Sequence, residues 1–257
     1  MSDGETRYER DGAIARITFD RPAARNAMTW RMYEQLSEAC KKIAQDTEVR
    51  VAVFRGAGGR SFVAGTVIAQ FQTFTADDGV AYETSMEGFL DALEKLQVPT
   101  LAIVEGWAIG GGLAIAACCD FRIATPGARF GVPIARTLGN CLSMANYARI
   151  VSSVGVANAK RLLVLGDTIT AEEAKGSGFV LDVVAAEGID ARVTELCDRL
   201  ARNAPVTMRV SKEAIRRLLY ATLPEDEDLI RAAYGSGDFR QGVRAFVEKR
   251  EPKWTGK

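Results

Sequence analysis

The sequence predicts an α/β fold in which residues 1–195 form a core of alternating strands and helices and residues 196–257 form a helical C-terminal region. Three observations support this prediction. Short apolar runs typical of strands recur through the first half of the chain, helical patterns separate them, and the chain after Ser143 is mostly helical in pattern. Strands separated by helices indicate parallel crossovers, with the functional residues at one edge of the sheet.

The first strand and helix have well-marked boundaries. Residues 13–19 alternate apolar and polar side chains as a half-buried strand does, and Pro22 follows, which cannot donate to a strand ladder. Thr29 is placed as the N-cap of a helix that runs to about Gln45, with apolar residues on one face. Residues 49–54 are predicted to form a buried strand.

The next predicted helix covers residues 77–96 and ends before Pro99. A buried strand is expected over 100–104, and another over 121–124. Between these two strands, small residues crowd positions 106–117, which indicates close packing around a turn and a helix.

The remainder of the chain is predicted to be helical apart from a short strand over 180–184. Thr170 and Glu173 have the spacing of a capping box, which opens a helix. Residues 238–250 form an amphipathic helical pattern.

Composition excludes several functional classes. The 33 basic residues balance the 33 acidic residues, so no net charge favours nucleic acid or an anionic membrane surface as a partner. The sequence contains no histidine, which excludes Ser-His-Asp and Cys-His nucleophiles, HExxH zinc sites and imidazole bases. No apolar run reaches the ~18 residues of a membrane helix, and the polar first residues do not resemble a signal peptide. Five cysteines, an odd number, indicate reduced thiols and a cytoplasmic location.

Two glycine-containing turns are candidates for chemistry. Residues 110–112 are all glycine and precede a helix, where unpaired N–H groups favour a phosphate or a developing oxyanion. A dinucleotide motif would need glycine in place of Ile115, and no GKS or GKT follows for a P-loop. Residues 61–66 form a second turn, expected to lead from a strand into a helix. Two such turns can build an oxyanion hole. The alternative is that the glycines only permit tight, closely packed turns.

Six motifs occur in a fixed order along the chain. They are Asn26-Ala27-Met28, Ser61-Phe62-Val63-Ala64-Gly65, Glu105-Gly106-Trp107-Ala108-Ile109-Gly110-Gly111-Gly112, Cys119-Asp120-Phe121-Arg122-Ile123-Ala124, Ala128-Arg129-Phe130-Gly131-Val132-Pro133 and Phe246-Val247-Glu248-Lys249-Arg250. Together they resemble the enoyl-CoA hydratase/isomerase (crotonase) family over about residues 8–252. The resemblance implies a crotonase-type (ClpP-like) spiral of ββα units, a helical C-terminal trimerisation region, and a homotrimer or a hexamer.

The resemblance also implies what the protein binds. The substrate is an acyl-CoA thioester, with no separate cofactor and no metal. The family holds the thioester enolate with two backbone N–H groups, which here belong to Thr66 and Gly111. The residues expected to contact the CoA moiety are Arg25, Ala27, Ala64, Phe246 and Lys249, the last two from a neighbouring subunit.

The chain departs from the family at both glutamates that hydratases use. Ala114 and Ile134 occupy those positions, and Val67 stands where the family often has aspartate. Hydration by the usual two-glutamate route is therefore not expected. The oxyanion hole still supports other enolate chemistry of the family, such as a double-bond shift, decarboxylation, dehalogenation or C–C hydrolysis.

Several side chains are candidates to replace the missing groups. Arg136 can hold a substrate carboxylate, or lie on a solvated loop or subunit interface. Asn140 can hydrogen-bond the substrate, or cap the helix that follows. Glu83 and Glu87 share a helix face at spacing i,i+4; either can act as a general acid or base in an apolar pocket, or both can face solvent.

Three further residues have a more ordinary interpretation. Cys141 lacks a neighbouring base and is expected to be a packing residue rather than a nucleophile. Tyr82 is expected in the core, and Asp120 is expected to make a structural hydrogen bond.

The expected function is an acyl-CoA lyase or isomerase that acts through an enolate. The alternatives are a decarboxylase or hydrolase of the same family, or a non-catalytic paralogue that binds acyl-CoA without chemistry. RNA binding, which some members of the family show, is disfavoured because no basic patch is evident.

Overall fold

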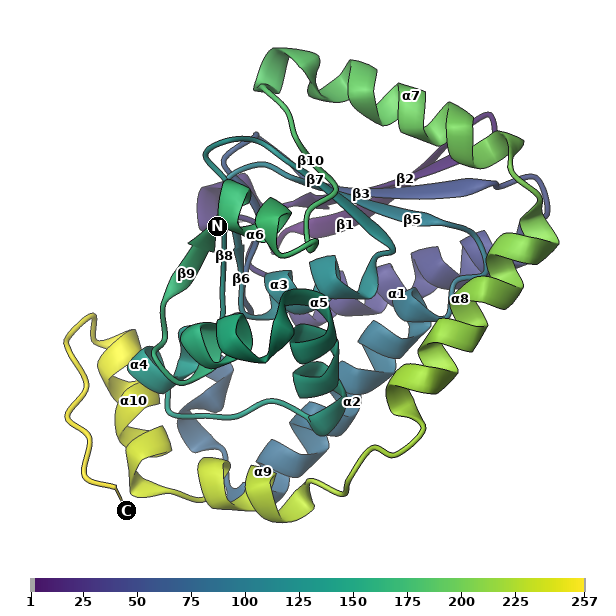
Figure 1. Cartoon of the computed structure of the whole chain (residues 1–257). Helices are drawn as coiled ribbons and strands as arrows, with labels where there is room; N and C mark the ends of the chain where they lie inside the picture. The colour runs from purple at the N-terminus through teal and green to yellow at the C-terminus, as the bar shows by residue number, and fades with distance from the viewer. Residues whose placement is uncertain (1–2, 257) are drawn as a thin grey trace.

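The computed structural model describes residues 3–256, which form two sheets surrounded by helices (Figure 1). The larger sheet has the order β1-β2-β3-β5-β7-β10 and the smaller has the order β4-β6-β8-β9. The strands are β1(Glu5–Asp11), β2(Ile14–Asp20), β3(Val51–Gly56), β4(Ser61–Ala64), β5(Thr100–Val104), β6(Trp107–Ile109), β7(Phe121–Ala124), β8(Arg129–Gly131), β9(Thr168–Thr170) and β10(Asp182–Val183). Neighbouring strands are parallel except in the pairs β1–β2 and β8–β9. The predicted α/β class is confirmed.

Helices connect and cover the strands. They are α1(Trp30–Gln45), α2(Ala76–Glu94), α3(Gly111–Cys118), α4(Ile134–Thr137), α5(Met144–Leu163), α6(Ala171–Gly176), α7(Ile189–Arg202), α8(Pro205–Tyr220), α9(Glu227–Tyr234) and α10(Gly237–Val247), with short 3₁₀ helices η1(Pro22–Ala24), η2(Ile68–Thr73) and η3(Ala186–Gly188). Thr29 caps α1, and Thr170 with Glu173 forms the capping box of α6, both as predicted.

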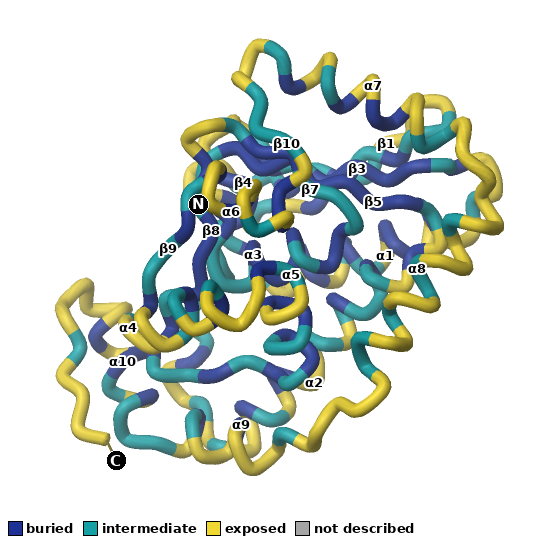
Figure 2. Tube along the Cα trace, in the orientation of Figure 1, coloured by how far each residue is buried: buried dark blue, intermediate teal, exposed yellow. Residues whose placement is uncertain are grey.

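The larger sheet is covered on both faces, which explains why most positions of its central strands are apolar. Alternate residues of β3 and β5 pack against α7, and the intervening residues face the main core on the opposite side of the sheet, where α1, α2 and α3 lie (Figure 1). The residues on the α7 side are Val51, Val53, Leu101 and Ile103, and those on the core side are Ala52, Phe54, Ala102 and Val104. Figure 2 shows these strands as a buried layer between exposed helix surfaces.

Five strands were not anticipated from the sequence. β1 is an edge strand whose side chains are mostly polar and exposed, so it lacks an apolar pattern. β4, β6, β8 and β9 have only three or four residues each, too few to show a periodicity. The turn expected over residues 61–66 is shorter than expected: residues 61–64 are strand β4, and Gly65 and Thr66 lead towards the 3₁₀ helix η2, which begins at Ile68.

The C-terminal helices differ in how they pack. The expected boundary at residue 195 falls inside α7. Helices α9 and α10 lie against α2 and η2, and Tyr234 and Phe239 are fully buried in the main core. Helix α8 contains no buried residue (Figure 2). The C-terminal region therefore includes both a part of the core and a helix, α8, that lies on the surface against α5.

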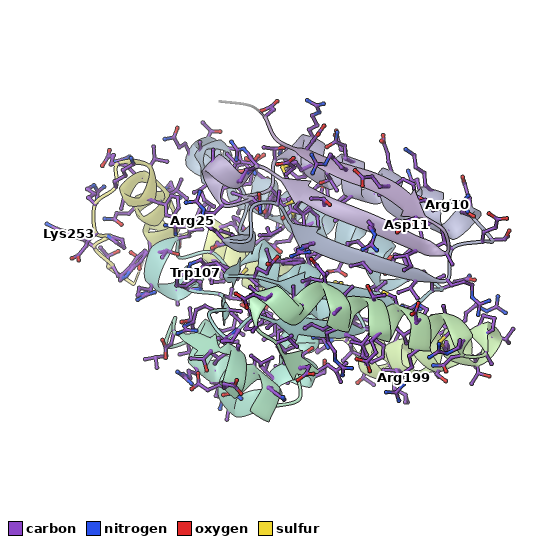
Figure 3. All side chains as sticks on the ribbon, turned by 90° about the horizontal axis from the view of Figure 1, so that it is seen from above. Arg10, Asp11, Arg25, Trp107, Arg199 and Lys253 are labelled. Atoms are coloured by element: carbon purple, nitrogen blue, oxygen red, sulfur yellow. The ribbon has the colours of Figure 1, made fainter. Side chains whose placement is uncertain are left out.

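Charged side chains cover the outside of the molecule. Seen from above, Arg10 and Asp11 mark the tip of the β1–β2 hairpin, and Arg25 and Trp107 lie toward the opposite end of the molecule (Figure 3). All five cysteines are buried and free. Between residues 3 and 256, no helix has the length and apolarity to cross a membrane, and no group of three or more His, Cys, Asp or Glu residues has the arrangement of a metal site.

Candidate active site

The two glycine turns meet because their strands are paired. β4 and β6 are parallel neighbours with Ala64 opposite Ile109, so the chain leaves both strands at the same edge of the smaller sheet. A Cβ atom on Gly110 would lie 3.7 Å from Gly65 Cα, which puts the two turns in van der Waals contact. Gly65 (φ 82°) and Gly110 (φ 56°) adopt backbone conformations that favour glycine.

Each turn directs an N–H group away from its own strand pairing. Thr66 forms a parallel β-bridge with Met28, in which the Gly65 carbonyl accepts from the Met28 amide and the Val67 amide donates to the Met28 carbonyl. Because these bonds use the groups on either side of Thr66, the N–H of Thr66 itself points away from Met28. Gly111 is the first residue of α3, and its N–H belongs to the first turn, which has no partner within the helix. Both residues line the same cavity.

This central cavity has a volume of about 100 Å³. Its lining is largely apolar and includes a few polar groups. The lining residues are Tyr33, Gly65, Thr66, Ile68, Phe71, Tyr82, Glu83, Met86, Leu90, Gly110, Gly111, Ala114, Ile134, Asn140, Leu142 and Asn146. Among the residues singled out from the sequence, Thr66, Gly111, Glu83 and Asn140 therefore come together here. Ala114 and Ile134 border the same space, so neither position places a carboxylate in it.

Glu83 is the carboxyl group of the cavity. It lies on α2 and is only 3% exposed, so the interpretation as a solvated face is wrong for this residue. The hydroxyl of Tyr234 donates to Oε1 at 2.6 Å, and the Ser143 amide donates to Oε2 at 3.1 Å. Burial raises the pKa of Glu83 to about 7, although these two hydrogen bonds act in the opposite direction. Glu83 thus changes charge near neutral pH.

Glu83 also faces a second pocket. This more open hollow of about 500 Å³ lies beside α2, and its other lining residues include Glu87, Ser143 and Asp226. The carboxyl of Glu83 therefore borders both the central cavity and a space closer to solvent.

Glu87, one turn further along α2, is engaged elsewhere. Its carboxylate accepts hydrogen bonds from Arg149 Nη1 at 2.9 Å and from Ser143 Oγ at 3.1 Å. Arg149 is 2% exposed and also binds Glu94, so both partly exposed carboxylates pair with one buried guanidinium. Glu87 does not line the central cavity.

The remaining candidates have other environments. Arg136 is exposed on α4, beside Gly166, and does not line the cavity. Cys141 is buried, and burial raises the pKa of its thiol to about 12, which agrees with a packing role. Asp120 accepts hydrogen bonds from the Thr100 amide and from Lys212, the structural role expected for it.

The helix-capping interpretation of Asn140 is wrong. The N-cap of α5 is Ser143, whose hydroxyl accepts a hydrogen bond from the Asn146 amide. Asn140 Nδ2 instead donates to the Tyr234 hydroxyl at 3.3 Å, which links Asn140 to the group that binds Glu83.

Two tyrosines at the site were not singled out as site residues. The hydroxyl groups of Tyr33 and Thr66 are 2.9 Å apart, and burial raises the pKa of Tyr33 to about 12, so this hydroxyl stays protonated. A Cβ on Gly111 would lie 2.6 Å from the Tyr33 hydroxyl, so a side chain there would displace that hydroxyl. Tyr234 lies 151 positions from Glu83, and no local pattern in the sequence connects them.

The residues expected at the CoA moiety lie outside the cavity lining. Arg25 is exposed in a left-handed conformation (φ 53°), and its carbonyl accepts from the Ala64 amide at 3.1 Å. Ala27 and Ala64 are half-buried near this turn. Phe246 is half exposed on α10, and Lys249 follows the end of that helix.

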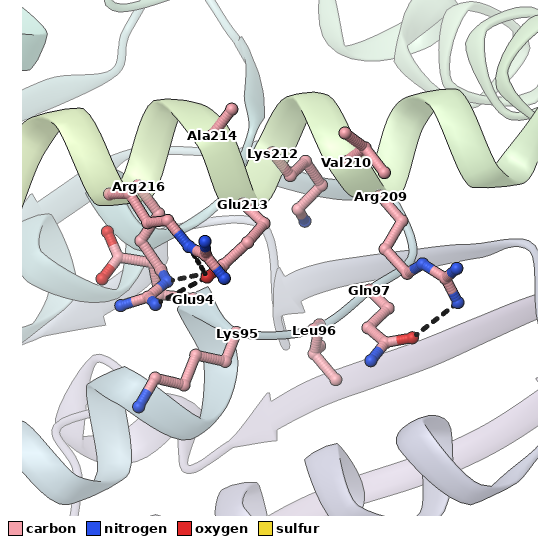
Figure 4. Close-up of a pocket in the computed structure, with 11 residues that line it drawn as sticks. Glu94, Lys95, Leu96, Gln97, Arg209, Val210, Lys212, Glu213, Ala214 and Arg216 are labelled. Carbon is pink, nitrogen blue, oxygen red and sulfur yellow. Dashed lines mark hydrogen bonds and ion pairs between the residues drawn. The ribbon is translucent and has the colours of Figure 1, made fainter.

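A larger hollow of about 630 Å³ lies between α8 and the end of α2 (Figure 4). Several of its polar side chains pair within it: Arg216 and Arg217 bind Glu213, and Arg209 hydrogen-bonds to Gln97. Neither glycine turn borders this hollow. The central cavity is therefore the better candidate for chemistry.

Solved structures identify the fold. An enoyl-CoA hydratase/carnithine racemase from Magnetospirillum magneticum is 34% identical with a TM-score of 0.79, covering 98% of this chain and 96% of that one. A methylmalonyl-CoA decarboxylase complexed with 2S-carboxypropyl-CoA is 25% identical with a TM-score of 0.87 over the whole of both chains. The protein has the crotonase fold, as the motifs predicted.

The sequence relatives identify the family. The family model for enoyl-CoA hydratase/isomerase matches residues 9–257. A short-chain-enoyl-CoA hydratase from Clostridium acetobutylicum is 32% identical over 95% of this chain and 94% of its own length. A probable mitochondrial enoyl-CoA hydratase from Dictyostelium discoideum is 30% identical over 97% of this chain and 90% of its own length. The protein belongs to the enoyl-CoA hydratase/isomerase family of acyl-CoA enzymes.

The raised pKa of Glu83 predicts a pH-dependent stability. Relative to an ordinary glutamate (pKa 4.5), Glu83 favours the folded state while protonated, and this contribution is lost as pH rises from 4.5 through about 7. Between pH 4.5 and pH 8, the free energy of unfolding of the wild type should fall by about 3 kcal/mol relative to that of Glu83→Gln. Urea unfolding at both pH values measures this difference. The Glu38→Gln variant, at an exposed position, should show the same change in unfolding free energy with pH as the wild type. If the difference in unfolding free energy between the wild type and Glu83→Gln were the same at both pH values, the raised pKa of Glu83 would be contradicted.

Proposed function

We propose that the protein is an enolate-forming lyase or isomerase of acyl-CoA thioesters, with the N–H groups of Thr66 and Gly111 as its oxyanion hole and Glu83 as its acid–base group. One observation carries the proposal: both glycine turns and a buried carboxyl group with a pKa near 7 border one cavity. A carboxyl group with this pKa is present in both protonation states near neutral pH, as proton transfer in both directions requires.

The thioester carbonyl oxygen would lie between the two N–H groups. Negative charge develops on that oxygen when the α-proton leaves, and each fixed donor contributes roughly 2.7–4 kcal/mol to such a transition state. The α-carbon then faces the cavity, where ionised Glu83 takes the proton. The second pocket beside Glu83 offers a path by which the carboxyl exchanges protons with solvent without crossing the acyl group.

The cavity favours a short acyl group. Its volume of about 100 Å³ is much smaller than that of the two outer pockets, and Phe71, Met86 and Leu90 make much of its wall apolar. A single carboxyl can remove a proton from one carbon and return it to another, or remove it as a leaving group departs. The first is a double-bond shift and the second is a lyase reaction, and neither needs the two glutamates replaced by Ala114 and Ile134.

The proposal includes self-association. Helix α8 exposes apolar side chains that nothing else in residues 3–256 covers, and burial of such surface stabilises an oligomer. These residues are Val206, Val210, Ile215 and Leu218. A homotrimer or a hexamer, as the family resemblance implies, would cover this helix. It would also bring a second chain to the site, as the expected roles of Phe246 and Lys249 require.

The catalytic proposal predicts exchange of the α-protons of butyryl-CoA with deuterium in D2O, read by mass spectrometry. Glu83→Gln should slow this exchange at least about 100-fold because its amide cannot accept the proton. Glu87→Gln, one turn away on the same helix, should stay within a few-fold of wild type. Equal losses in both variants would contradict the role of Glu83. Binding of butyryl-CoA without any exchange by the wild type would identify a binding-only protein.

The assembly proposal predicts a solution mass of three or six times that of one chain by light scattering. The double substitution Ile215→Asp and Leu218→Asp should lower this mass, because charge on an apolar interface is costly. Arg217→Ala, at an exposed position on the same helix, serves as the control. A monomeric wild type, or an unchanged mass in the double variant, would contradict an interface through α8.

A further inference from the structure

Arg149 on α5 is a buried arginine that binds two carboxylates of α2. Its guanidinium binds Glu87 through two nitrogens, Nη1 to Oε2 at 2.9 Å and Nη2 to Oε1. Nε and Nη2 also bind Glu94 Oε2, at 3.1 and 2.9 Å. Burying a guanidinium group is costly unless its charge is paired, and this two-nitrogen pairing uses the planar fork that lysine lacks. Arg149 is therefore the counter-ion of Glu87.

Glu83, one turn away on α2, binds uncharged groups instead. Its two donors are the Tyr234 hydroxyl and the Ser143 amide. The hydroxyl of Ser143 donates to Glu87 Oε2 at 3.1 Å, so both carboxyl groups bind the same residue at the start of α5. The two carboxyl groups are close neighbours, and negative charge on Glu87 raises the pKa of Glu83 by repulsion.

Most other titratable groups that face Glu83 are uncharged near neutral pH. They are Tyr33, Tyr82, Cys141, Tyr147 and Tyr234, and burial raises the pKa of each above its ordinary value. Asp226, at the start of α9, is a carboxylate that also raises the pKa of Glu83, and it binds the Met144 amide at 2.6 Å. Arg216 on α8 borders the second pocket and binds Glu213. Glu87 is therefore the negative charge beside Glu83 that Arg149 offsets.

We propose that Arg149 is a positioning residue that gives the two glutamates different roles: as the counter-ion of Glu87 it holds that carboxylate against α5 and offsets its charge, so that Glu83 can give up and take back a proton near neutral pH. This rests on the proposed function, in which Glu83 removes the α-proton. Without Arg149, the charge of Glu87 beside Glu83 would no longer be offset. Glu87 lies nearer to solvent, with 28% of its side chain exposed, so the added repulsion would keep the proton on Glu83.

An infrared titration of Glu83 tests this role without any substrate. The C=O stretch of the protonated carboxyl is identified as the band that Glu83→Gln lacks. In Arg149→Met, which keeps a similar length and removes the charge, the midpoint of this titration should rise by about one pH unit or more. Adding Glu87→Gln removes the unpaired charge and should return the midpoint to the wild-type value or below it.

Arg161→Met is the matched control. Arg161 also lies on α5 and binds two carboxylates, Asp167 and Glu173, but it lies outside both pockets that Glu83 borders. This variant should therefore leave the midpoint of Glu83 unchanged.

The pH profile of deuterium exchange into butyryl-CoA separates an electrostatic role from damage to the site. Arg149→Met should slow exchange about tenfold at pH 6, and exchange should recover toward the wild-type rate above the new inflection. A role in folding alone would lower exchange at every pH, and Glu87→Gln would not reverse the loss.

An unchanged midpoint in Arg149→Met, or a raised midpoint that the added Glu87→Gln does not lower, would overturn the role of Arg149. If Arg149→Met does not fold, Glu87→Gln alone decides the question. This variant keeps an oxygen for both Arg149 and Ser143 and removes only the charge, so the midpoint of Glu83 should fall, and an unchanged midpoint would overturn the role.

Failure of the proposed function would look different. The exchange rate of the wild type would then show no inflection at the infrared midpoint of Glu83, whatever the variants did to that midpoint. The role of Arg149 in the reaction would be overturned with it.

Discussion

The parallel pairing of β4 with β6 is the constraint on which the candidate site depends. Because Ala64 pairs with Ile109, the two strands end at the same level of the sheet. The turns Gly65-Thr66 and Gly110-Gly111 therefore leave the sheet side by side. Helix α3 then starts so close to β4 that a Cβ on Gly112 would lie 1.9 Å from the Val63 carbonyl oxygen. Displacing either strand by one residue would separate the two N–H groups, whatever side chains lined the cavity. Gly112 follows from this close approach, whereas Gly65 and Gly110 follow from their positive φ angles.

Burial gives the site a carboxyl group with a raised pKa. Helices α2 and α9 enclose Glu83, and the resulting desolvation outweighs the two hydrogen bonds that favour its charged form. Tyr234, the last residue of α9, completes this environment from the C-terminal region. That region is therefore part of the candidate site. The same enclosure joins Asn140 to Glu83 through one hydroxyl group.

Patterns within the sequence predicted the parts of the structure that local residues determine. The apolar runs at 100–104 and 121–124, the Thr29 cap and the two glycine turns all follow from short-range preferences. Strands such as β6 and β8 were not predicted, because three residues are too few to show the alternation of apolar and polar side chains. The ordered motifs identified the family, which no single pattern would have done.

The choice between Glu83 and Glu87 could not be made from the sequence. The two residues share one helix face, and their periodicity is the same. Contacts with distant residues separate them, since Arg149 binds Glu87 while Tyr234 binds Glu83. The role of Asn140 was open for the same reason, because its orientation depends on Tyr234 at a separation of 94 positions. Charge state and orientation are properties of packing, which a single sequence does not encode locally.

The pH dependence of α-deuterium exchange into butyryl-CoA tests the central claim most directly. If Glu83 takes the proton, the rate should rise with pH and level off above an inflection near 7. Tyr234→Phe should move this inflection to higher pH, because the lost hydrogen bond favours the ionised carboxyl. An inflection near 4.5, or a rate independent of pH between 5 and 9, would show that another group removes the proton and would contradict the account.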